Sequence, residues 1–401
     1  MREFDITKKQ KKVLTIFGTR PEAIKLAPII HELGRHPELQ SRICVTAQHR
    51  EMLDQALNLF GIVPDIDLNL MHPGQTLPEL TARILLAIDN ILQQEAPDIV
   101  LVQGDTTTAM AAAMAAFYRQ VPVGHVEAGL RSGHQFSPFP EEMNRRVATI
   151  TSAIHFAPTE IARDALIKEG IPESRIFVTG NPVIGALQFI LQKPIPLVAD
   201  ALLKRAKVNG KASDRKLILV TAHRRENFGE NLENIYMGLK FLSERNRDVV
   251  FIYPVHLNPN VHELAYKLLE NQERIILVDP VEYDVLAHLM RASYLILTDS
   301  GGIQEEGPSL GKPVLVMRTE TERPEGIAAG TAKLVGTSAD RIVAETETLL
   351  RDNSVYQHMA KAINPYGDGQ AAMRIVNVLL TWTNCVENEK DMTIPKNWTE
   401  Q

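Results

Sequence analysis

The sequence contains few of the residues that support disulfides, membrane spans or nicotinamide sites. Its two cysteines, Cys44 and Cys385, have a spacing that fits neither a CxxC redox pair nor a metal knuckle, so a reducing cytoplasm is the expected setting. No stretch approaches about 18 apolar residues, and the start MREFDITKKQKK lacks an apolar region, so we expect neither a membrane span nor a signal peptide. No GxGxxG motif occurs, which argues against a dinucleotide cofactor.

The sequence also lacks a strong excess of one charge. The formal net charge is -6, and no block of five or more like charges occurs. Nucleic-acid binding through a broad basic face is therefore not expected, and any phosphate group must be bound by a few Arg, Lys and backbone N–H groups. Because no dense group of metal ligands is present either, we expect no metal and no cofactor.

The length and the apolar pattern predict two domains. A chain of 401 residues exceeds the roughly 250–300 at which one hydrophobic core stops growing. Short Val-, Ile- and Leu-rich runs alternate with amphipathic segments, as buried parallel strands alternate with helices. Six such runs lie in the first half, at 13–17, 43–46, 99–102, 123–126, 154–157 and 176–178. Six more lie in the second half, at 217–221, 249–253, 275–278, 294–297, 314–317 and 332–335.

Each half therefore resembles a complete α/β domain, doubly wound and Rossmann-like. We expect residues 1–182 to form the first domain, completed by a C-terminal helix at 371–401 that crosses back onto it. Residues 183–370 form the second domain, with a linker and its first helix at 187–213. The active site is expected in the cleft between the domains.

The first strand leads into FGTRPEAIK, which indicates a helix start beside a ligand. Gly18 suits a tight turn, and Pro21 suits the first helical position. Arg20 and Lys25 lie near the positive end of the helix dipole, where anions are favoured, so a ligand phosphate between them explains the cations. The alternative is an ordinary first turn with an exposed Arg and Lys.

Three sources of carboxylates follow strands of the first domain. Asp105 ends one strand before a run of threonines that can cap an Ala-rich helix, Glu127 ends the next strand, and FPEEMNRR supplies Glu141 and Glu142. A single strand-end Asp is often only a helix cap. Several acids at one sheet edge exceed what capping needs, and crowded acids raise one another's pKa towards the range useful for proton transfer.

The second domain carries candidate phosphate-binding residues after its strands. His223 follows the first strand, and its neighbouring arginines should lower its pKa, so that it can act as a neutral donor or proton shuttle. The segment TDSGGIQEEGPSLGKP fits a backbone cradle for phosphate followed by an acid that can bind a ribose diol. The candidates in this domain are His223, His256, Ser300, Gly301, Gly302, Glu306 and Arg323.

Taken together, these motifs resemble the non-hydrolysing UDP-N-acetylglucosamine 2-epimerases of bacteria. The resemblance rests on FGTRPEAIK, TAQHREMLDQ, GDTTT, PVGHVEAGLR, PEEMNRR, TGNPVI, AHRREN, YPVHLNPN, TDSGGIQEEGPSLGKPVLVMR, TERPEG and NPYGDGQA, and it runs from Val13 to Leu380. It implies a glycosyltransferase-B-like pair of Rossmann domains, a cytoplasmic homodimer and a role in polysaccharide biosynthesis. The implied reaction interconverts UDP-N-acetylglucosamine and UDP-N-acetylmannosamine through elimination of UDP and a 2-acetamidoglucal-like intermediate.

The resemblance also implies roles for matching residues. It assigns the UDP part of the substrate to Arg20, Lys25, His223, Ser300, Gly301, Gly302, Glu306 and Arg323. It assigns the sugar and its proton transfers to Asp105, Glu127 and Glu141. One segment differs from the family: Val281 and Leu286 stand where several members have Gln and Phe, so backbone contacts should hold more of the uracil.

Some members of the family bind a second UDP-N-acetylglucosamine as an activator. The matching residues Gln48, His49, Glu141, Arg224 and His256 are present. Glu51, however, replaces a Gln of regulated relatives, and MHPGQTL lacks an Arg of their corresponding loop. A new carboxylate and a lost guanidinium both weaken the binding of an anion, so the sequence predicts a weakened activator site.

Three other functions fit parts of the pattern. A UDP-sugar glycosyltransferase shares the architecture but needs an acceptor site and no acids on both faces of C2. A hydrolysing epimerase uses the same elimination and releases UDP and free N-acetylmannosamine. A sugar-nucleotide sensor binds without turnover, and the three acids disfavour it.

Overall fold

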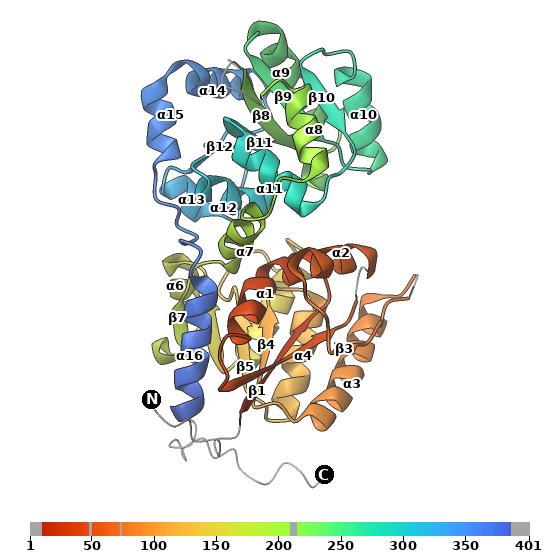
Figure 1. Ribbon diagram of the computed structural model, residues 1–401, viewed down its shortest axis with the longest axis vertical. Helices are drawn as coiled ribbons and strands as arrows, with labels where there is room; N and C mark the ends of the chain where they lie inside the picture. Colours follow the sequence, from red (N-terminus) through yellow and green to blue (C-terminus); the bar gives the residue numbers. More distant parts are fainter. Residues whose placement is uncertain (1–9, 48–49, 73, 209–214, 386–401) are drawn as a thin grey trace. The chain divides into compact units, whose positions relative to one another are not determined.

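A computed structural model describes residues 10–47, 50–72, 74–208 and 215–385 (Figure 1). The chain divides into two compact units: residues 1–182 with 370–401 form unit 1, and residues 183–369 form unit 2. Each unit contains one parallel sheet with helices between successive strands. The predicted fold class, two Rossmann-like units of the glycosyltransferase-B-like class, is confirmed. No described helix is both long enough and apolar enough to cross a membrane.

Unit 1 has a seven-stranded sheet in the order β3-β2-β1-β4-β5-β6-β7. Its strands are β1 (Lys11–Phe17), β2 (Leu39–Val45), β3 (Ile66–Asp67), β4 (Ile99–Gln103), β5 (Val123–Val126), β6 (Ile154–Ala157) and β7 (Ile176–Val178). Its helices are α1 (Arg20–Leu33), α2 (Arg50–Phe60), α3 (Leu77–Glu95), α4 (Thr107–Tyr118), α5 (Glu141–Thr151), α6 (Glu160–Lys168), the short 3-10 helix η1 (Glu173–Arg175) and α16 (Ala371–Cys385). Within this unit α16 packs against α1 (Figure 1), and α4 packs against both α3 and α5.

Unit 2 has a six-stranded sheet in the order β10-β9-β8-β11-β12-β13. Its strands are β8 (Lys216–Thr221), β9 (Val249–Pro254), β10 (Ile275–Val278), β11 (Leu295–Thr298), β12 (Val314–Val316) and β13 (Ala332–Leu334). Its helices are α7 (Pro182–Leu191, which begins at the last residue of unit 1), α8 (Leu197–Arg205), η2 (Arg225–Asn227), α9 (Glu230–Arg245), α10 (Pro259–Leu269), α11 (Tyr283–Ala292), α12 (Gly301–Ser309), α13 (Pro324–Ala328), α14 (Ala339–Arg351) and α15 (Asn353–Ala360).

The structure corrects the strand count of the first half. Seven strands are present where six were predicted, and the missed strand is β3. It has two residues, Ile66 and Asp67, which pair with Cys44 and Val45 of β2. Such a short edge strand with a polar residue produces no apolar run. The predicted linker at 187–213 is also helical at its start, because α7 extends to Leu191.

Burial on both sheet faces explains the continuous apolar strands. All five residues of β4 are buried, as is expected when helices cover both faces of a parallel sheet. The alanines of α4 let this helix lie close to the sheet, and Ala109, Ala112 and Ala116 have no exposed surface. Each fully buried Val, Leu or Ile contributes roughly 1.5–3 kcal/mol, so these strands anchor the loops at their ends.

The strand order reverses once in each sheet, and the candidate residues follow the strands at these points. In unit 1 the reversal lies between β1 and β4, and in unit 2 it lies between β8 and β11. The loops after two such neighbouring strands diverge to opposite faces, which leaves a crevice where ligands of open α/β sheets bind. Arg20 and Asp105 follow the first pair of strands, and His223 and Ser300 follow the second.

Candidate functional site

Gly18 allows the β1–α1 turn of unit 1 to lie against neighbouring hydroxyls. A Cβ at this position would overlap Thr46 Oγ1 and lie 2.7 Å from Thr108 Oγ1. These two hydroxyls also bond to each other at 2.9 Å. The turn that the sequence predicts is therefore present, and a residue larger than glycine would displace the start of α1. Arg20, the first residue of α1, is partly exposed beside it.

Glu22, which the sequence analysis missed, ties two loops together at the reversal of strand order. Its Oε2 accepts bonds from the backbone N–H groups of Gly18 at 3.1 Å and Thr19 at 2.8 Å, and from Thr19 Oγ1 at 2.8 Å. Its Oε1 accepts a bond from Thr106 Oγ1 at 2.8 Å. Burial raises the pKa of Glu22 to about 7, although these bonds act in the opposite direction. The pattern of Thr19 followed by Glu22 is a capping box, a signal present in the sequence.

Glu127 lies at the end of β5 in a left-handed backbone conformation, with φ of 64°. Lys25 Nζ lies 2.6 and 2.7 Å from its two carboxylate oxygens, and Asn181 Nδ2 donates to Oε1 at 2.7 Å. Gln103 at the end of β4 also donates to Oε2. A non-glycine residue in this region is strained and persists where its surroundings hold it, as these three donors do. Lys25, predicted to bind UDP, is thus joined to the carboxylate predicted to act on the sugar.

Asp105 and Glu141 are connected through α5. Arg145 of this helix pairs with the Asp105 carboxylate, and Asn144 Nδ2 donates to the Asp105 carbonyl oxygen at 3.0 Å. Glu141 begins the helix, and its Oε2 is buried with no hydrogen-bond partner among the described residues. A buried oxygen without a partner costs about 1–3 kcal/mol, so it favours a ligand that donates a hydrogen bond.

The four carboxylates of this region differ in their environment. Glu142 is fully buried and pairs with Arg145 and Arg146, which is a structural arrangement. Glu127 lies close to the loop that carries Asp105, because a Cβ at Gly104 would be 3.5 Å from Glu127 Oε2. Asp105 and Glu127 therefore follow the neighbouring strands β4 and β5 at one edge of the unit 1 sheet, and Glu141 begins the helix whose Arg145 pairs with Asp105. Groups of this kind can remove and deliver protons.

In unit 2 the loop after β8 is anchored by a buried carboxylate, Asp299, which follows β11. The backbone N–H groups of His223 and Arg224 each donate to Asp299 Oδ2 at 2.8 Å. The His223 ring stacks on that of His256, with centroids 5.5 Å apart. The pKa of His223 is lowered, as predicted, but burial is the main cause; Arg224 and His256 add to it and Asp299 opposes it.

The segment predicted to bind phosphate in unit 2 lies at the N-terminus of α12. Ser300 is the N-cap, and Gly301 and Gly302 begin the helix. A Cβ at Gly301 would lie 3.3 Å from Arg323 Cζ and 3.5 Å from Arg224 Nη2. Two guanidinium groups thus lie beside backbone N–H groups at a helix N-terminus, an arrangement that binds phosphate.

Acidic residues that the sequence analysis missed hold these arginines. Arg323 Nε donates to Glu305 Oε1 at 2.8 Å, and Arg323 Nη1 lies 3.2 Å from Glu322 Oε1. Burial alone would raise the pKa of Glu322, but Arg323 and Arg318 outweigh it and bring the pKa to about 2. Glu322 therefore stays ionised and holds Arg323 as well as Arg224, whose Nη2 lies 3.6 Å from Glu322 Oε1.

Two residues assigned to the nucleoside part lie on or beside α11 and α12. Glu306 Oε2 accepts a hydrogen bond from Tyr283 Oη at 2.7 Å, and burial raises the pKa of Tyr283 far above 10, so its hydroxyl stays a donor. Leu286 lies in α11, where its N–H already donates to the Glu282 carbonyl at 3.0 Å. That N–H is therefore not one of the backbone contacts expected for the base.

Three of the five predicted activator residues, Glu141, Arg224 and His256, lie in the described part of the chain. Gln48 and His49 lie outside the described residues. Arg224 and His256 lie together in unit 2 beside His223, and His256 Nδ1 accepts the Asn258 N–H at 3.0 Å. In the described part of the chain, no three His, Cys, Asp or Glu side chains are grouped to hold a metal ion.

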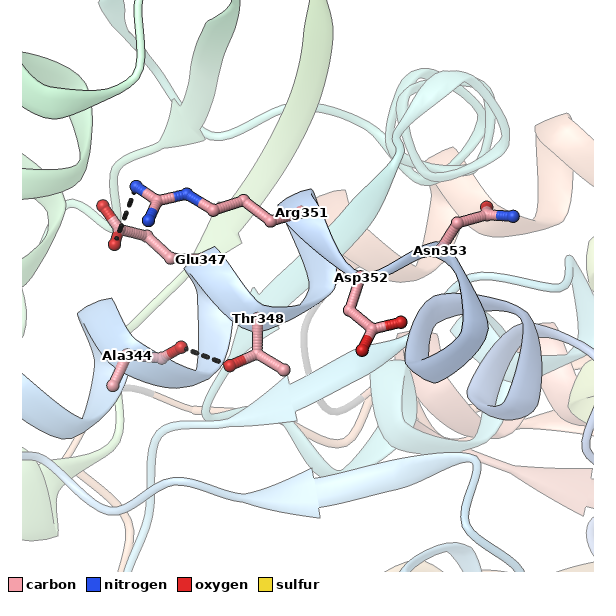
Figure 2. Close-up of a pocket in the computed structure, with 6 residues that line it drawn as sticks. All are labelled: Ala344, Glu347, Thr348, Arg351, Asp352 and Asn353. Carbon is pink, nitrogen blue, oxygen red and sulfur yellow. Dashed lines mark hydrogen bonds and ion pairs between the residues drawn. The ribbon is translucent and has the colours of Figure 1, made fainter.

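The pocket in Figure 2 is separate from these residues. It has a volume of about 510 Å³ and lies along α14 and the start of α15, lined by Ala344, Glu347, Thr348, Arg351, Asp352 and Asn353. Arg351 pairs with Glu347 at 3.0 Å, and the Thr348 hydroxyl bonds to the Ala344 carbonyl at 2.9 Å. Because these polar groups satisfy one another, the pocket gives no indication of a ligand. The sheet edges are the stronger candidate.

Comparison with known proteins points to one family. The family model described as UDP-N-acetylglucosamine 2-epimerase matches residues 31–380. The chain is 54% identical over 374 residues to the UDP-N-acetylglucosamine 2-epimerase of Salmonella typhimurium, covering 92% of this chain and 99% of that one. It is also 54% identical to the Escherichia coli enzyme of the same name over 370 residues, covering 92% and 98%. The crystal structure of UDP-GlcNAc 2-epimerase from Neisseria meningitidis bound to UDP-GlcNAc is 49% identical, with a TM-score of 0.85 and coverage of 92% and 100%.

Proposed function

Because the chain belongs to the UDP-N-acetylglucosamine 2-epimerase family, we propose that it interconverts UDP-N-acetylglucosamine and UDP-N-acetylmannosamine without net hydrolysis. The observation that carries this proposal is the group of Asp105, Glu127 and Glu141 at one edge of the unit 1 sheet in a chain of this family. Epimerisation at C2 needs acid and base groups, and a binding protein or simple transferase does not need three.

The proposed reaction proceeds by elimination and re-addition. The C2 hydrogen is not next to a carbonyl, so direct deprotonation is difficult. The C1–O bond to UDP breaks with its electrons leaving on UDP, while a base removes the C2 proton, and a C1–C2 double bond forms. UDP then adds back to C1 of this 2-acetamidoglucal-like intermediate, and an acid delivers a proton to the opposite face of C2. Each positioned acid or base contributes about 10²–10⁴-fold to the rate.

The residues divide by role in this proposal. Asp105, Glu127 and Glu141 act on the sugar, and Lys25 neutralises Glu127. Backbone N–H groups of Ser300, Gly301 and Gly302, with Arg323 and Arg20, hold the diphosphate as it becomes a leaving group. Glu306 binds the ribose, and Leu286 lies against the base through its side chain. His223 contacts the diphosphate and can carry a proton.

We also propose a cytoplasmic homodimer that supplies its product to polysaccharide synthesis. The two cysteines support the cytoplasmic setting, because secreted proteins that depend on disulfides are richer in cysteine. The product is an activated amino sugar, which is the chemical form that polymerising glycosyltransferases consume.

Proton NMR of the purified protein with UDP-N-acetylglucosamine in D₂O tests the function. The expected result is UDP-N-acetylmannosamine with deuterium at C2 in both nucleotide sugars. Free N-acetylmannosamine together with UDP would identify a hydrolysing epimerase. Turnover only with an added acceptor would identify a glycosyltransferase, and binding without turnover would identify a sensor.

A further inference from the structure

Asp299 occupies a position in unit 2 that no role in substrate binding explains. It follows β11, and its side chain is fully buried. Strands β11 and β8 are neighbours, with Thr298 paired to Thr221, so the residue after β11 lies beside the loop after β8. The Asp299 N–H donates to the Thr221 carbonyl at 3.0 Å, which fixes its backbone. The carboxylate is therefore directed at the segment that begins with His223.

The two oxygens of Asp299 are used differently. Oδ2 accepts from the His223 and Arg224 N–H groups at 2.8 Å and from Asn227 Nδ2 at 3.1 Å. Oδ1 is buried and has no hydrogen-bond partner among the described residues. His223 Nδ1 lies 3.7 Å from Oδ1, slightly beyond hydrogen-bond length. A ring movement of about 1 Å closes this gap, and such bonds in ligand-free sites commonly tighten when a ligand binds.

We propose that Asp299 is a positioning residue for His223: its Oδ1 accepts the Nδ1–H of the ring, so that Nε2 can give its proton to the departing diphosphate of UDP and take the same proton back when UDP adds again to C1. This inference rests on the proposed function, in which His223 contacts that diphosphate. The two ring nitrogens are not equivalent, because the group that holds one of them decides which carries the proton in the neutral ring. A carboxylate only accepts, so it selects the Nδ1–H form.

The surrounding charges support the assignment. The groups that face His223 are Arg224 in its own loop, His256 stacked on its ring after β9, and Asp299 after β11. Burial, Arg224 and His256 lower the pKa of His223, and Asp299 is the group that raises it. Without this carboxylate the ring would carry a proton less readily when the diphosphate leaves. The same side chain anchors the loop through backbone bonds, so position and proton affinity are set together.

The test compares Asp299→Asn with wild type and with a matched control, Asp352→Asn. Asp352 also accepts two backbone N–H groups in unit 2, those of Ser354 and Val355, but no histidine contact is recorded for it within the described part of the chain. In Asp299→Asn, the amide oxygen can keep the backbone bonds, and the amide nitrogen then faces Nδ1 as a donor. The neutral ring should change to the Nε2–H form, with a lower pKa.

Two measurements decide the question. Long-range ¹H–¹⁵N NMR of the imidazoles, assigned with His223→Gln and recorded with UDP bound, should show the Nδ1–H form in wild type and the Nε2–H form in Asp299→Asn. In the same variant kcat should fall roughly 10²-fold or more, as expected when a histidine is held in the wrong tautomer, while KM changes less and Asp352→Asn keeps wild-type rates.

Failure of the Asp299 proposal can be distinguished from failure of the proposed function. An Nε2–H ring in the wild-type complex with UDP overturns the proposal even if Asp299→Asn does not fold. Unchanged kcat and an unchanged tautomer in folded Asp299→Asn overturn it as well. Absence of epimerisation by the wild type would instead remove the proposed function, because the tautomer of His223 is measured without turnover.

Discussion

The three candidate carboxylates of unit 1 differ in the hydrogen-bond donors that surround them. Glu127 is surrounded by donors from Lys25, Gln103 and Asn181, whereas Glu141 has a buried oxygen without a partner in the described residues. Asp105 lies between these cases, since it pairs with Arg145 and remains partly exposed. A carboxylate that accepts from several donors is held in place, whereas a buried oxygen without a donor is open to a hydrogen bond from a ligand.

We predict that Asp105→Asn, Glu127→Gln and Glu141→Gln each lower turnover by roughly 10²-fold or more, because each removes a group that can transfer a proton. Asp89→Asn is the matched control, since Asp89 forms a surface ion pair with Arg119 in the same unit. Steady-state rates measure the effect, and circular dichroism checks the fold. Wild-type rates in all three variants would remove the carboxylate assignment.

The sequence predicts which residues reach the site better than it predicts what supports them. Asp105 and Glu127 follow apolar strand runs, so their place at a sheet edge can be derived from strand order. Gln103, Asn181 and Asp299 act through contacts between segments far apart in the chain, and no local pattern marks such partners. Of the supporting residues, only Glu22 is marked by a local sequence pattern, its capping box.

Among the elements, the N-terminus of α12 leaves little room for an added side chain. We predict that Gly301→Ala raises KM for UDP-N-acetylglucosamine about 10-fold or more, because its Cβ would lie 3.1 Å from Glu322 Oε1 and 3.3 Å from Arg323 Cζ and displace the cradle. Gly34→Ala is the control, since a Cβ there would meet only carbonyl oxygens at 3.5 Å or more. Equal KM values for the two variants would show that the cradle does not bind the diphosphate.

Strands β5 and β6 contain a pair of buried histidines, His125 and His155, which lie opposite each other. Burial lowers the pKa of His125 to about 4 and that of His155 to about 3. Both are neutral in the folded protein at pH 5, whereas the unfolded chain binds protons below about 6.5. The stability that these two neutral histidines contribute is therefore fully present above pH 6.5, and it is lost as the pH falls towards 4.

We predict that the unfolding free energy of His155→Gln falls less than that of the wild type between pH 6.5 and pH 5, by on the order of 2 kcal/mol. Glu22 acts in the opposite direction, because its raised pKa makes stability fall as the pH rises from 4.5 to about 7. The wild-type profile alone therefore mixes two effects. The unfolding free energy of His155→Gln is measured with urea over this pH range and compared with that of His134→Gln, a variant at an exposed position. The same pH dependence in both variants would contradict the role given to His155.

At the level of the whole chain, two features can be derived from the sequence. They are the division into two units and the return of the last helix, α16, to unit 1. Two complete sets of strand runs give two sheets, and the Pro- and Gly-containing break at 364–369 precedes α16. The edge strand β3 escaped detection because two residues form no periodic pattern. Assembly with other chains depends on surface patches that periodicity does not report.

We predict a homodimer formed through the helical layer of unit 1 that contains α3, α4 and α5. Its exposed apolar side chains are Leu86, Phe117, Tyr118 and Ile150, and the last two are 64% and 74% exposed. Apolar groups gathered on packed neighbouring helices mark an interface more often than scattered ones do. Analytical ultracentrifugation should give twice the chain mass for wild type and for the control Val63→Glu, and a monomer for Tyr118→Glu with Ile150→Glu. A dimer of the double variant would place the interface elsewhere.

Two positions in unit 1 bear on the predicted weakening of the activator site, which would affect the behaviour of the whole enzyme. Glu51 is exposed in the first turn of α2 and carries a charge where regulated relatives are neutral. The loop MHPGQTL contains no arginine, and the nearby guanidinium of Arg83 is already bonded to Gln75. A second diphosphate would thus meet a repulsive carboxylate and lack a bidentate contact.

We predict that pure UDP-N-acetylmannosamine is converted with little lag and little stimulation by trace UDP-N-acetylglucosamine. Glu51→Gln should increase that stimulation, and Glu38→Gln, another exposed glutamate of unit 1, should leave it unchanged. Strict dependence of the wild type on the trace additive would mean that the activator binds despite Glu51, through contacts that outweigh its charge.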